Sequence, residues 1–340
     1  MERIIFHVDV NSAFLSWEAA RRVKNGEDDI RLIPSIIGGD RSKRTGVVLA
    51  KSIPAKKCGI KTGEPVAMAL RKCPQLFMVK PDFSLYEHNS REFIKICSEY
   101  APIVEKFSID ECFLDMSGMS KIYPDIIAVA FEIKDRIKKE LGFTVNVGIG
   151  SNKLLAKMAS DFEKPDKVHT LFESEIQRKM WNLPIRDLFS VGEATAQRLE
   201  KAYIKTIGEL ARLDINILKS LVGVKLGEHL YNYANGIDES PVLECRERAK
   251  GYSNSITLEY DVQSMTEAEN ILLALVDVTA MRMRTDGAKA YCVGVTVRDS
   301  NFQDKAHQKK LVVATDITNE LFADIFNNFK NSINPDFLFL

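Results

Sequence analysis

The hydrophobic pattern at the start of the chain predicts a buried strand that ends in a carboxylate. Residues 4–8 are almost all apolar, and Asp9 follows them directly. Burial of a carboxylate without a partner is costly. A helix is expected to begin near Phe14, so the stretch HVDVNSAF places a single acid and an aromatic ring at one strand-to-helix corner.

Alternating strand and helix patterns continue to about residue 171. They predict two strands joined by a Gly-Gly-Asp turn within 30–52, a helix from 84 that stops near Pro102, a strand at 107–117, a helix at 125–141 that ends before Gly142, a strand at 143–150, and a helix at 151–162 with Ser151 as its N-cap. Because these elements follow no strict βαβ period, we expect an α+β fold with a mixed or antiparallel sheet.

The second half of the chain changes character twice. Residues 172–240 have a helical pattern with short glycine-containing turns, and a polar linker follows. From residue 250 the pattern is mixed again: strands are predicted at 252–262, 290–299 and 308–315, with helices at 264–285, where Ser264 and Glu267 are spaced as a capping box, and at 316–333. This last block is expected to be a small α+β domain.

Composition narrows the class of protein. A chain of 340 residues predicts two to four domains. No apolar run approaches the ~20 residues of a membrane helix, and the N-terminus has no signal-peptide pattern. The six cysteines are scattered without a CxxC pair, which argues against structural zinc and favours reduced thiols in the cytoplasm: 58, 73, 97, 112, 245 and 292.

The net charge of the chain is zero, but the charge is unevenly distributed. Residues 1–81 contain 15 basic and 8 acidic residues, a net charge of +7, whereas residues 82–171 contain 12 and 15. A positive first quarter suits phosphate binding. A solvated basic face explains the same numbers, so both interpretations stay open.

Three acidic residues form the first candidate site. Asp9 ends the opening strand, and Asp110 and Glu111 are adjacent in FSIDECFLD. Neighbours on a regular strand point to opposite faces, so both can reach one site only at a strand end or a bulge. Clustered carboxylates suit Mg²⁺ or Mn²⁺, and two such ions catalyse phosphoryl transfer. The alternative is that these acids are ordinary strand-end and surface charges.

Lysines form the second candidate site. They are placed to meet phosphate groups, although solvated helix-surface lysines are the common alternative. The spacing puts Lys153 and Lys157 on one helical face. The others are Lys164 before Pro165, and Lys51, Lys56 and Lys57 in AKSIPAKKCGIKTG.

Two turns in the helical block are candidate DNA contacts. LFSVGEATAQRL and SLVGVKLGEHL resemble helix-hairpin-helix turns, whose backbone N–H groups bind DNA phosphates without reading sequence. The first has Ser190 where glycine is commoner. An ordinary helix–turn–helix connection is the alternative. The corresponding DNA-binding candidates are Val191, Gly192, Gly223 and Lys225.

These stretches together resemble the Y-family DNA polymerases, most closely those of the DNA polymerase IV type. HVDVNSAF is similar to the family's opening motif, SIDECFLDMS to its most specific motif, and VNVGIGSNKLLAKMASDFEKP to the end of its palm. The resemblance runs in order through the chain and weakens in the last domain. It implies low-fidelity, template-directed DNA synthesis that bypasses damaged bases.

The resemblance also implies a right-hand architecture. The palm would be residues 1–12 and 82–171, and small fingers would be residues 13–81. A helix-hairpin-helix thumb at 172–240, a linker at 241–249 and a little finger at 250–340 would follow. The family usually has a final strand at the C-terminus, so we expect either a truncated end or a shortened strand at Phe337–Leu340.

The resemblance assigns roles to individual residues. Asp9, Asp110 and Glu111 would hold two Mg²⁺ ions, for which Mn²⁺ can substitute, with the backbone carbonyl of Val10 as a further ligand. Phe14 falls at the position of the steric gate, a ring that leaves no space for the 2′-hydroxyl of a ribonucleotide. Without the resemblance, we would interpret this ring as part of a core.

The expected triphosphate site departs from the family's pattern. Lys164 falls where the family has a triphosphate-binding lysine, but Ile53 and Lys56 replace a tyrosine and an arginine. Lys56 lacks the bidentate fork of arginine, so we expect weaker nucleotide binding or compensation by Lys57 or Lys51. Asn11 and Ala13 also replace residues that are often acidic and aromatic.

The expected partners follow from the resemblance. They are primer–template DNA and deoxynucleoside triphosphates, bound by a monomer in the cytoplasm without membrane contact. A sliding clamp stays open as a partner, because DFLFL lacks the glutamine that begins a clamp-binding peptide. Two other classes also stay open: a non-catalytic DNA-binding or scaffold protein with the same fold, and a nucleotidyl cyclase with a palm domain.

Overall fold

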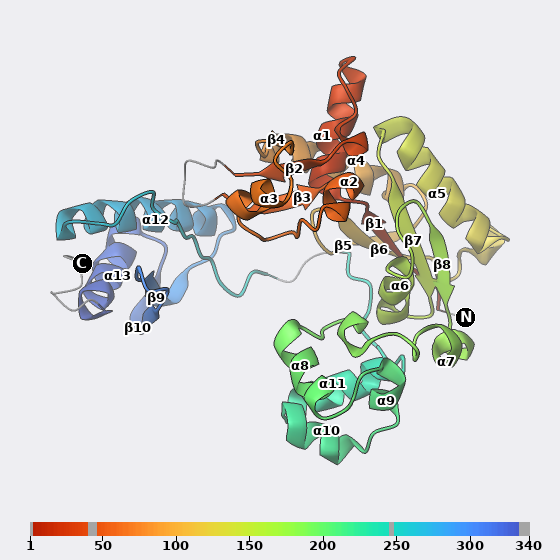
Figure 1. The fold of residues 1–340 in the computed structure, drawn as a ribbon. Helices are drawn as coiled ribbons and strands as arrows, with labels where there is room; N and C mark the ends of the chain where they lie inside the picture. The colour runs from red at the N-terminus through yellow and green to blue at the C-terminus, as the bar shows by residue number, and fades with distance from the viewer. Residues whose placement is uncertain (1–2, 40–45, 245–247, 333–340) are drawn as a thin grey trace. The chain divides into compact units, whose positions relative to one another are not determined.

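A computed structural model describes residues 3–39, 46–244 and 248–332 of the chain. The described chain forms two compact units, one within residues 3–244 and one within residues 248–332 (Figure 1). In the described residues, no helix is both long enough and apolar enough to cross a membrane.

The larger unit is organised around a five-stranded mixed sheet. Its strand order is β5-β6-β1-β7-β8, in which only β7 and β8 run parallel. The strands are β1 (Ile5–Val10), β5 (Ile103–Lys106), β6 (Glu111–Asp115), β7 (Val145–Gly150) and β8 (Val168–Leu171). The predicted mixed sheet is confirmed, and β1 lies at its centre.

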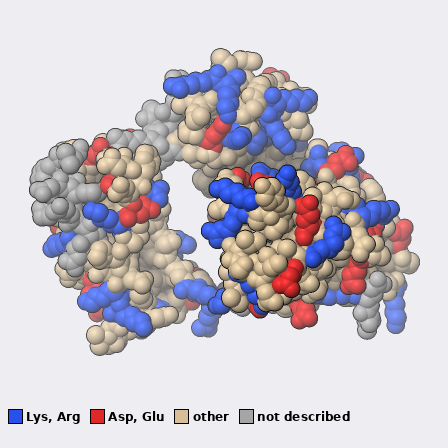
Figure 2. All heavy atoms as spheres, turned by 60° about the horizontal axis from the view of Figure 1, so that its bottom comes forward, with Lys and Arg blue, Asp and Glu red and all other residues tan. Residues whose placement is uncertain are grey.

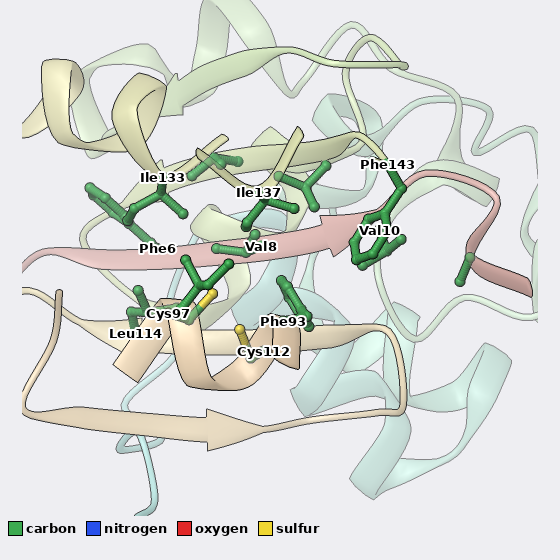
Figure 3. Close-up of a cluster of buried hydrophobic side chains, with 14 of the residues drawn as sticks. Phe6, Val8, Val10, Phe93, Cys97, Cys112, Leu114, Ile133, Ile137 and Phe143 are labelled. Carbon is green, nitrogen blue, oxygen red and sulfur yellow. The ribbon is translucent and has the colours of Figure 1, made fainter. Parts of the chain in front are cut away.

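One face of this sheet is apolar and carries the main core. Phe6, Val8 and Val10 project from β1 toward α4 (Phe83–Ser98) and α5 (Ile126–Leu141), as Figure 3 shows. Helix α4 ends at Ser98, four residues before the predicted stop, and Gly142 ends α5 with a φ of 78°, as predicted.

The opposite face of the sheet, called the polar face below, carries His7, Asp9 and Glu111 beside the apolar residues Ile5 and Phe113. It is partly covered by α6 (Lys153–Ser160). Glycines in β7 permit this close packing: a Cβ on Gly148 would lie 2.0 Å from the carbonyl oxygen of Ala156. The N-cap of α6 is Asn152, not the predicted Ser151, because the amide oxygen of Asn152 accepts the backbone N–H of Leu155 at 2.8 Å.

The segment between β1 and α4 forms a small α/β layer. Helix α1 (Ala13–Lys24) leads to a second sheet of order β3-β2-β4, made of β2 (Ser35–Gly38), β3 (Val48–Lys51) and β4 (Phe77–Val79). The two strands predicted within 30–52 are confirmed. Of the predicted Gly-Gly-Asp turn, Gly38 is the last residue of β2 and Gly39 follows it, whereas Asp40 lies outside the described residues. The short helices are η1 (Ile30–Leu32), α2 (Ile53–Lys57) and α3 (Val66–Lys72).

Residues 172–244 of the larger unit are helical and pack around a second core, which they share with α6. Leu155, Leu199 and Leu230 are buried in this core, and Trp181 packs against it. The helices are η3 (Glu173–Glu175), α7 (Ile176–Lys179), η4 (Ile185–Asp187), α8 (Glu193–Lys201), α9 (Ile207–Ala211), α10 (Ile215–Val222) and α11 (Val224–Ala234), with η2 (Met119–Lys121) in the sheet region.

The smaller unit is a two-stranded antiparallel sheet packed with two helices. It contains α12 (Met265–Thr285), β9 (Ala290–Arg298), β10 (Asp304–Thr315) and α13 (Thr318–Ser332). Ser264 is the N-cap of α12, as predicted, but the capping box is incomplete, because the carboxylate of Glu267 accepts the N–H of Gln263 instead of that of Ser264. The strand predicted at 252–262 is wrong: these residues form no strand, and Ile256 and Tyr260 are exposed. The expected strand at Phe337–Leu340 lies outside the described residues.

Candidate active site

A cavity of about 430 Å³ lies where β1, α1, β3 and α2 meet. It combines acidic residues on one side with lysines from separate segments. It is lined by Asp9, Val10, Asn11, Ser12, Ala13, Phe14, Leu49, Ala50, Lys51, Ser52, Ile53, Lys56, Thr62, Asp110, Lys164 and Pro165. Residues distant in sequence thus come together in the larger unit.

Asp9 lies on the polar face of the sheet, near the end of β1. Only 8% of the residue is exposed, and its carboxylate forms an ion pair with Lys164. Burial raises the pKa of Asp9 to about 6, although Lys164 acts in the opposite direction. For Lys164, burial acts to lower the pKa, but Asp9 and Asp161 raise it to about 12. Lys164 is therefore the cation that balances the single acid of the opening motif.

Asp110 sits in the tight turn that leads into β6. Its carboxylate accepts a hydrogen bond from the Ser108 hydroxyl at 2.6 Å, and its backbone carbonyl accepts the N–H of Val10 at 3.0 Å. This second bond joins the turn to the end of β1. The expectation that adjacent acids need a strand end to reach one site agrees with this position.

Glu111 begins β6 and is directly opposite Asp9 in the antiparallel register. Its carboxylate contacts His7 Nε2 at 3.2 Å and Lys157 Nζ at 2.7 Å. Burial acts to raise the pKa of Glu111, but hydrogen bonds from His7 and Lys157 lower it to about 2. Burial lowers the pKa of His7 to about 4, so the imidazole is neutral near pH 7.

The three predicted metal ligands are neighbours but do not all line the cavity. Asp9 and Asp110 do, whereas Glu111 is turned toward His7 and Lys157. Within the described residues, no three His, Cys, Asp or Glu side chains converge closely enough to hold a metal ion. The two-metal assignment therefore stays a prediction, supported by the oxygen-donor chemistry of the site.

Phe14 lies in the first turn of α1 and lines the cavity. Its ring stacks on Tyr86 with centroids 4.5 Å apart and planes 13° apart, and it contacts Trp17 and Phe83 at 5.9 and 6.3 Å. The ring is partly buried and also lines the cavity. It therefore fits both interpretations, a residue of the core and a steric gate. Aromatic packing holds the wall of the cavity rigid.

The lysines of the predicted phosphate site separate into two groups. Lys51 and Lys56 line the cavity with Lys164, and Ile53 lies between them at the start of α2. Lys57 does not line it, and Lys153 pairs with Glu105 at 2.7 Å, away from the cavity. Burial, together with the charge of Lys56, lowers the pKa of Lys51, whose ammonium donates to Thr62 at 2.8 Å.

The predicted helix-hairpin-helix turns have the expected local form. Gly223 joins α10 to α11 with a φ of 94°, and Gly192 is the N-cap of α8. Ser190 has a φ of 75°, a conformation that favours glycine. Gly192, Gly223 and Lys225 are exposed, and Val191 is partly buried. On the face drawn in Figure 2, basic and acidic side chains are interspersed over the surface.

Sequence reasoning missed the groups that position the carboxylates. His7 lies in the apolar run, two residues before Asp9, and this spacing on one strand face was an available signal. Asn11 and Asn146 are buried beside the site, and Asn146 is paired with Asp9 in the register of β1 and β7. No local pattern marks Asn146, because its partners come from three separate segments.

Three family models match the chain. The impB/mucB/samB family model matches residues 8–161, and its C-terminal domain model matches residues 249–333. The model of the DNA polymerase-iota thumb domain matches residues 186–238. The first covers the central sheet from within β1 as far as β7, and all cavity-lining residues except Lys164 and Pro165, and the third covers both predicted turns.

Curated relatives and a solved structure agree with these matches. The chain is 48% identical to the DNA polymerase IV of Clostridium acetobutylicum over 337 residues, 96% of this chain and 83% of the relative. It is 40% identical to that of Pelotomaculum thermopropionicum, over 88% of this chain and 73% of the relative. A Y-family DNA polymerase chimera has the same fold, with a TM-score of 0.85 over 96% of this chain and 93% of that chain at 21% identity. The chain therefore belongs to the impB/mucB/samB family, as a Y-family DNA polymerase of the DNA polymerase IV type.

Proposed function

We propose that the cavity between β1 and α2 is the catalytic site of a template-directed DNA polymerase that bypasses damaged template bases at low fidelity. The observation that carries this proposal is the composition of the cavity. It brings Asp9 and Asp110 together with three lysines, one of them paired with Asp9, and with an aromatic ring on the wall. A nucleoside triphosphate presents the matching set: phosphates for the lysines, and a sugar for the ring.

The carboxylates have the ligand chemistry that two Mg²⁺ ions require, although within the described residues no three of them converge on one point. Asp9, Asp110 and Glu111, with the carbonyl of Val10, would hold the ions, because hard divalent cations prefer oxygen ligands. When bound there, they would supply positive charge that activates the attacking 3′-hydroxyl and stabilises the leaving pyrophosphate. Because Asp9 is buried, its ionised form needs a positive partner, and this need favours the binding of a cation. Mn²⁺ has the same ligand preference.

Lys164 provides a charged group for the triphosphate. With a pKa of about 12 its ammonium stays protonated at any physiological pH. Its present partners, Asp9 and Asp161, are carboxylates, and phosphate oxygens are equivalent acceptors. Lys164 would therefore exchange Asp9 for a phosphate oxygen as the nucleotide binds.

Lys51 and Lys56 provide the remaining positive charge. The side chain of Ile53 has no hydrogen-bonding group, so the charged donors on this side of the cavity are the two ammonium groups. Burial is the main cause of the lowered pKa of Lys51, and repulsion by the ammonium group of Lys56 adds to it. A bound triphosphate would relieve that repulsion. Of the two candidates for compensation, Lys51 lines the cavity and Lys57 does not.

Phe14 would select deoxyribose. Its ring cannot move away from the cavity without losing its stacking on Tyr86. A 2′-hydroxyl directed at this ring would find no space and no hydrogen-bond partner, so ribonucleotides would bind with a penalty.

The helical region would hold the primer–template duplex. Backbone N–H groups at the N-termini of α8 and α11, near Val191, Gly192 and Gly223, would bind phosphates, and Lys225 would add a charge. Such contacts predict salt-sensitive binding without base readout. We further propose that the chain works as a monomer in the cytoplasm. A sliding clamp remains an open partner.

Primer extension tests the proposed function. With Mg²⁺ and deoxynucleotides, the wild type should extend a primer according to the template base, on undamaged templates and across an abasic site. Asp110→Ala should reduce the rate by at least about a hundredfold, because it removes a metal ligand. Asp115→Ala, at the far end of β6, is the matched control and should retain most of the activity.

Two outcomes would contradict the proposal. Metal-independent DNA binding without extension would favour a scaffold protein. A cyclic product from nucleotide alone would favour a cyclase. Equal extension by Asp110→Ala and the wild type would overturn the metal assignment while leaving the family unaffected.

A further inference from the structure

The segment that carries Lys164 is the loop of residues 161–167 between α6 and β8. A lysine can bind an incoming nucleotide only if the backbone beneath it is held in place. Pairing of β7 with β8 begins at Val168, and a backbone hydrogen bond from the N–H of Val147 to the carbonyl of Lys167, at 2.9 Å, holds only the last residue of the loop. The side chains that hold this loop therefore decide where the ammonium group of Lys164 stands.

Asn11 is the first of these side chains. It follows the last residue of β1, and only 8% of it is exposed. Its amide oxygen accepts hydrogen bonds from the backbone N–H of Asp166 and from the hydroxyl of Thr144, both at 3.0 Å. Its amide nitrogen donates to the amide oxygen of Asn146 at 3.1 Å. Asn11 thus connects the end of β1 to the loop.

Asn146 is the second, and it is fully buried in β7. Its amide nitrogen donates to the carbonyl oxygens of Ser160 and Glu163, at 2.9 and 2.7 Å. Its amide oxygen accepts the backbone N–H of Lys167 at 3.2 Å as well as the bond from Asn11. All four hydrogen-bonding positions of this amide are used.

Only an amide satisfies these partners. Asn146 must donate to two carbonyl groups and accept from two N–H groups, so aspartate would place a carboxylate against the oxygens of Ser160 and Glu163. Alanine would leave buried carbonyl and N–H groups without partners, which is costly. The same partners fix the orientation of the amide, because a flipped amide would direct its oxygen at two oxygens.

We propose that Asn11 and Asn146 form an amide clamp that positions Lys164 for the triphosphate. The clamp holds both sides of Lys164: Glu163 on one side, and Asp166 and Lys167 on the other. It also joins the loop directly to β1 beside Asp9, so one pair of side chains sets the distance between a metal-binding carboxylate and a phosphate-binding lysine. The inference rests on the proposed function of Lys164, and the two asparagines are positioning residues.

A second anchor, formed by the side chain of Asp166, joins the same loop to α5. The carboxylate of Asp166 bonds Lys134 at 2.9 Å and Lys138 at 2.7 Å on α5. This anchor would keep the loop attached to the protein if the clamp were removed. Loss of the clamp should therefore misplace Lys164 without unfolding the sheet.

A double-mutant cycle on nucleotide binding tests the clamp. Asn11→Ala and Asn146→Ala should each raise the KM for the correct deoxynucleotide about tenfold, with kcat changed less than about threefold, and Asn146→Asp should behave like Asn146→Ala. In the Lys164→Ala background, Asn11→Ala should add less than about twofold, because the residue it positions is already absent. Asn11 lies nearer the surface than Asn146, so Asn11→Ala disturbs the packing of the core less than Asn146→Ala does.

Thr144→Val is the matched control. It removes one hydrogen bond to Asn11 but leaves all three bonds from the clamp to the loop, so it should change KM by less than about twofold. Hydrogen exchange gives a readout that does not depend on activity. Asn11→Ala should accelerate exchange at the amides of Asp166 and Lys167, and Thr144→Val should not.

The outcomes separate the inference from the function on which it rests. Unchanged exchange in both asparagine variants would overturn the clamp. Fully additive effects of Asn11→Ala and Lys164→Ala on KM would show a general structural defect and would also overturn it. An unchanged KM in Lys164→Ala alone would overturn the proposed role of Lys164, and with it the functional part of the clamp, whatever the exchange rates show.

Discussion

Asp9 and Glu111 are directly opposite each other on two neighbouring strands, yet their surroundings differ. Asp9 opens onto a cavity and has a raised pKa, because burial outweighs its single lysine. Glu111 is closed off by His7 and Lys157, and their hydrogen bonds lower its pKa despite burial. The same polar face of one sheet thus contains a carboxylate that weakens the fold and a carboxylate that strengthens it.

The difference shows how a fold can keep acids together before any metal binds. Lysines 157 and 164 come from α6 and from the loop after it, and each neutralises one carboxylate. Two charges of one sign on neighbouring positions would otherwise destabilise the sheet. Asp9 faces the cavity and stays accessible to substrate. Glu111 is held in place by its hydrogen bonds with His7 and Lys157.

The largest expected effect concerns the cavity beside Asp9. Phe14→Ala should lower discrimination against ribonucleotides by about a hundredfold, because the wall beside the sugar is removed. Single-nucleotide insertion with matched ribo- and deoxynucleotides measures the ratio. Phe83→Ala, which removes a neighbouring ring outside the cavity lining, is the control. Unchanged sugar selection in Phe14→Ala would mean that the ring serves the core alone.

The stability of the fold should respond in opposite directions to neutralisation of the two acids. The folded pKa of Asp9, about 6, lies above its ordinary value of 3.8, so its ionised form weakens the fold as pH rises through this interval and above it. Asp9→Asn should therefore raise the free energy of unfolding at pH 7 by on the order of 2 kcal/mol. Urea denaturation in EDTA measures it.

Glu111→Gln should have the opposite effect. The folded pKa of Glu111, about 2, lies below its ordinary value of 4.5, so its ionised form stabilises the fold above pH 4.5 and this contribution is lost as pH falls toward 2. Glu111→Gln should cost on the order of 2 kcal/mol at pH 7 and almost nothing near pH 2. If Asp9→Asn and Glu111→Gln changed the free energy of unfolding by the same amount in the same direction, the two carboxylates would not differ in their effect on stability.

The smallest effect separates the two lysines that can compensate for Ile53. Lys51→Ala should raise the KM for deoxynucleotides about fivefold, because an ammonium group is lost from the cavity wall. Lys57→Ala, an exposed neighbour on α2 that does not line the cavity, should change KM less than twofold. The reverse order of the two effects would place the phosphates outside this cavity.

The sequence predicted the parts of this site that are local. The apolar runs of β1 and β6 and the motifs around Asp9, Asp110 and Lys164 are visible in short windows, and helix signals such as Gly142 and Ser264 were confirmed. The strand predicted at 252–262 failed because its alternating apolar residues have no sheet partner in the described structure. Branched residues favour a strand only where another strand is available.

The groups that position the site could not be predicted in the same way. His7 appeared to be one more residue of a buried strand, and its contact with Glu111 depends on the register of two strands a hundred residues apart. Asn146 bonds the side chain of Asn11, just after β1. It also bonds the carbonyl groups of Ser160, at the end of α6, and Glu163, in the loop that follows. Such contacts are set by topology, and no spacing in the sequence contains them.

The central claim is that Asp9 and Glu111 act in one metal-dependent site despite their opposite environments. Single-turnover primer extension by Asp9→Asn and Glu111→Gln, each titrated with Mg²⁺, tests it most directly. Both variants should lose at least about a hundredfold in maximal rate, although one is more stable than the wild type and the other less. A Glu111→Gln variant that extends the primer at the wild-type rate would contradict the account and would leave Glu111 as part of a structural ion pair with Lys157.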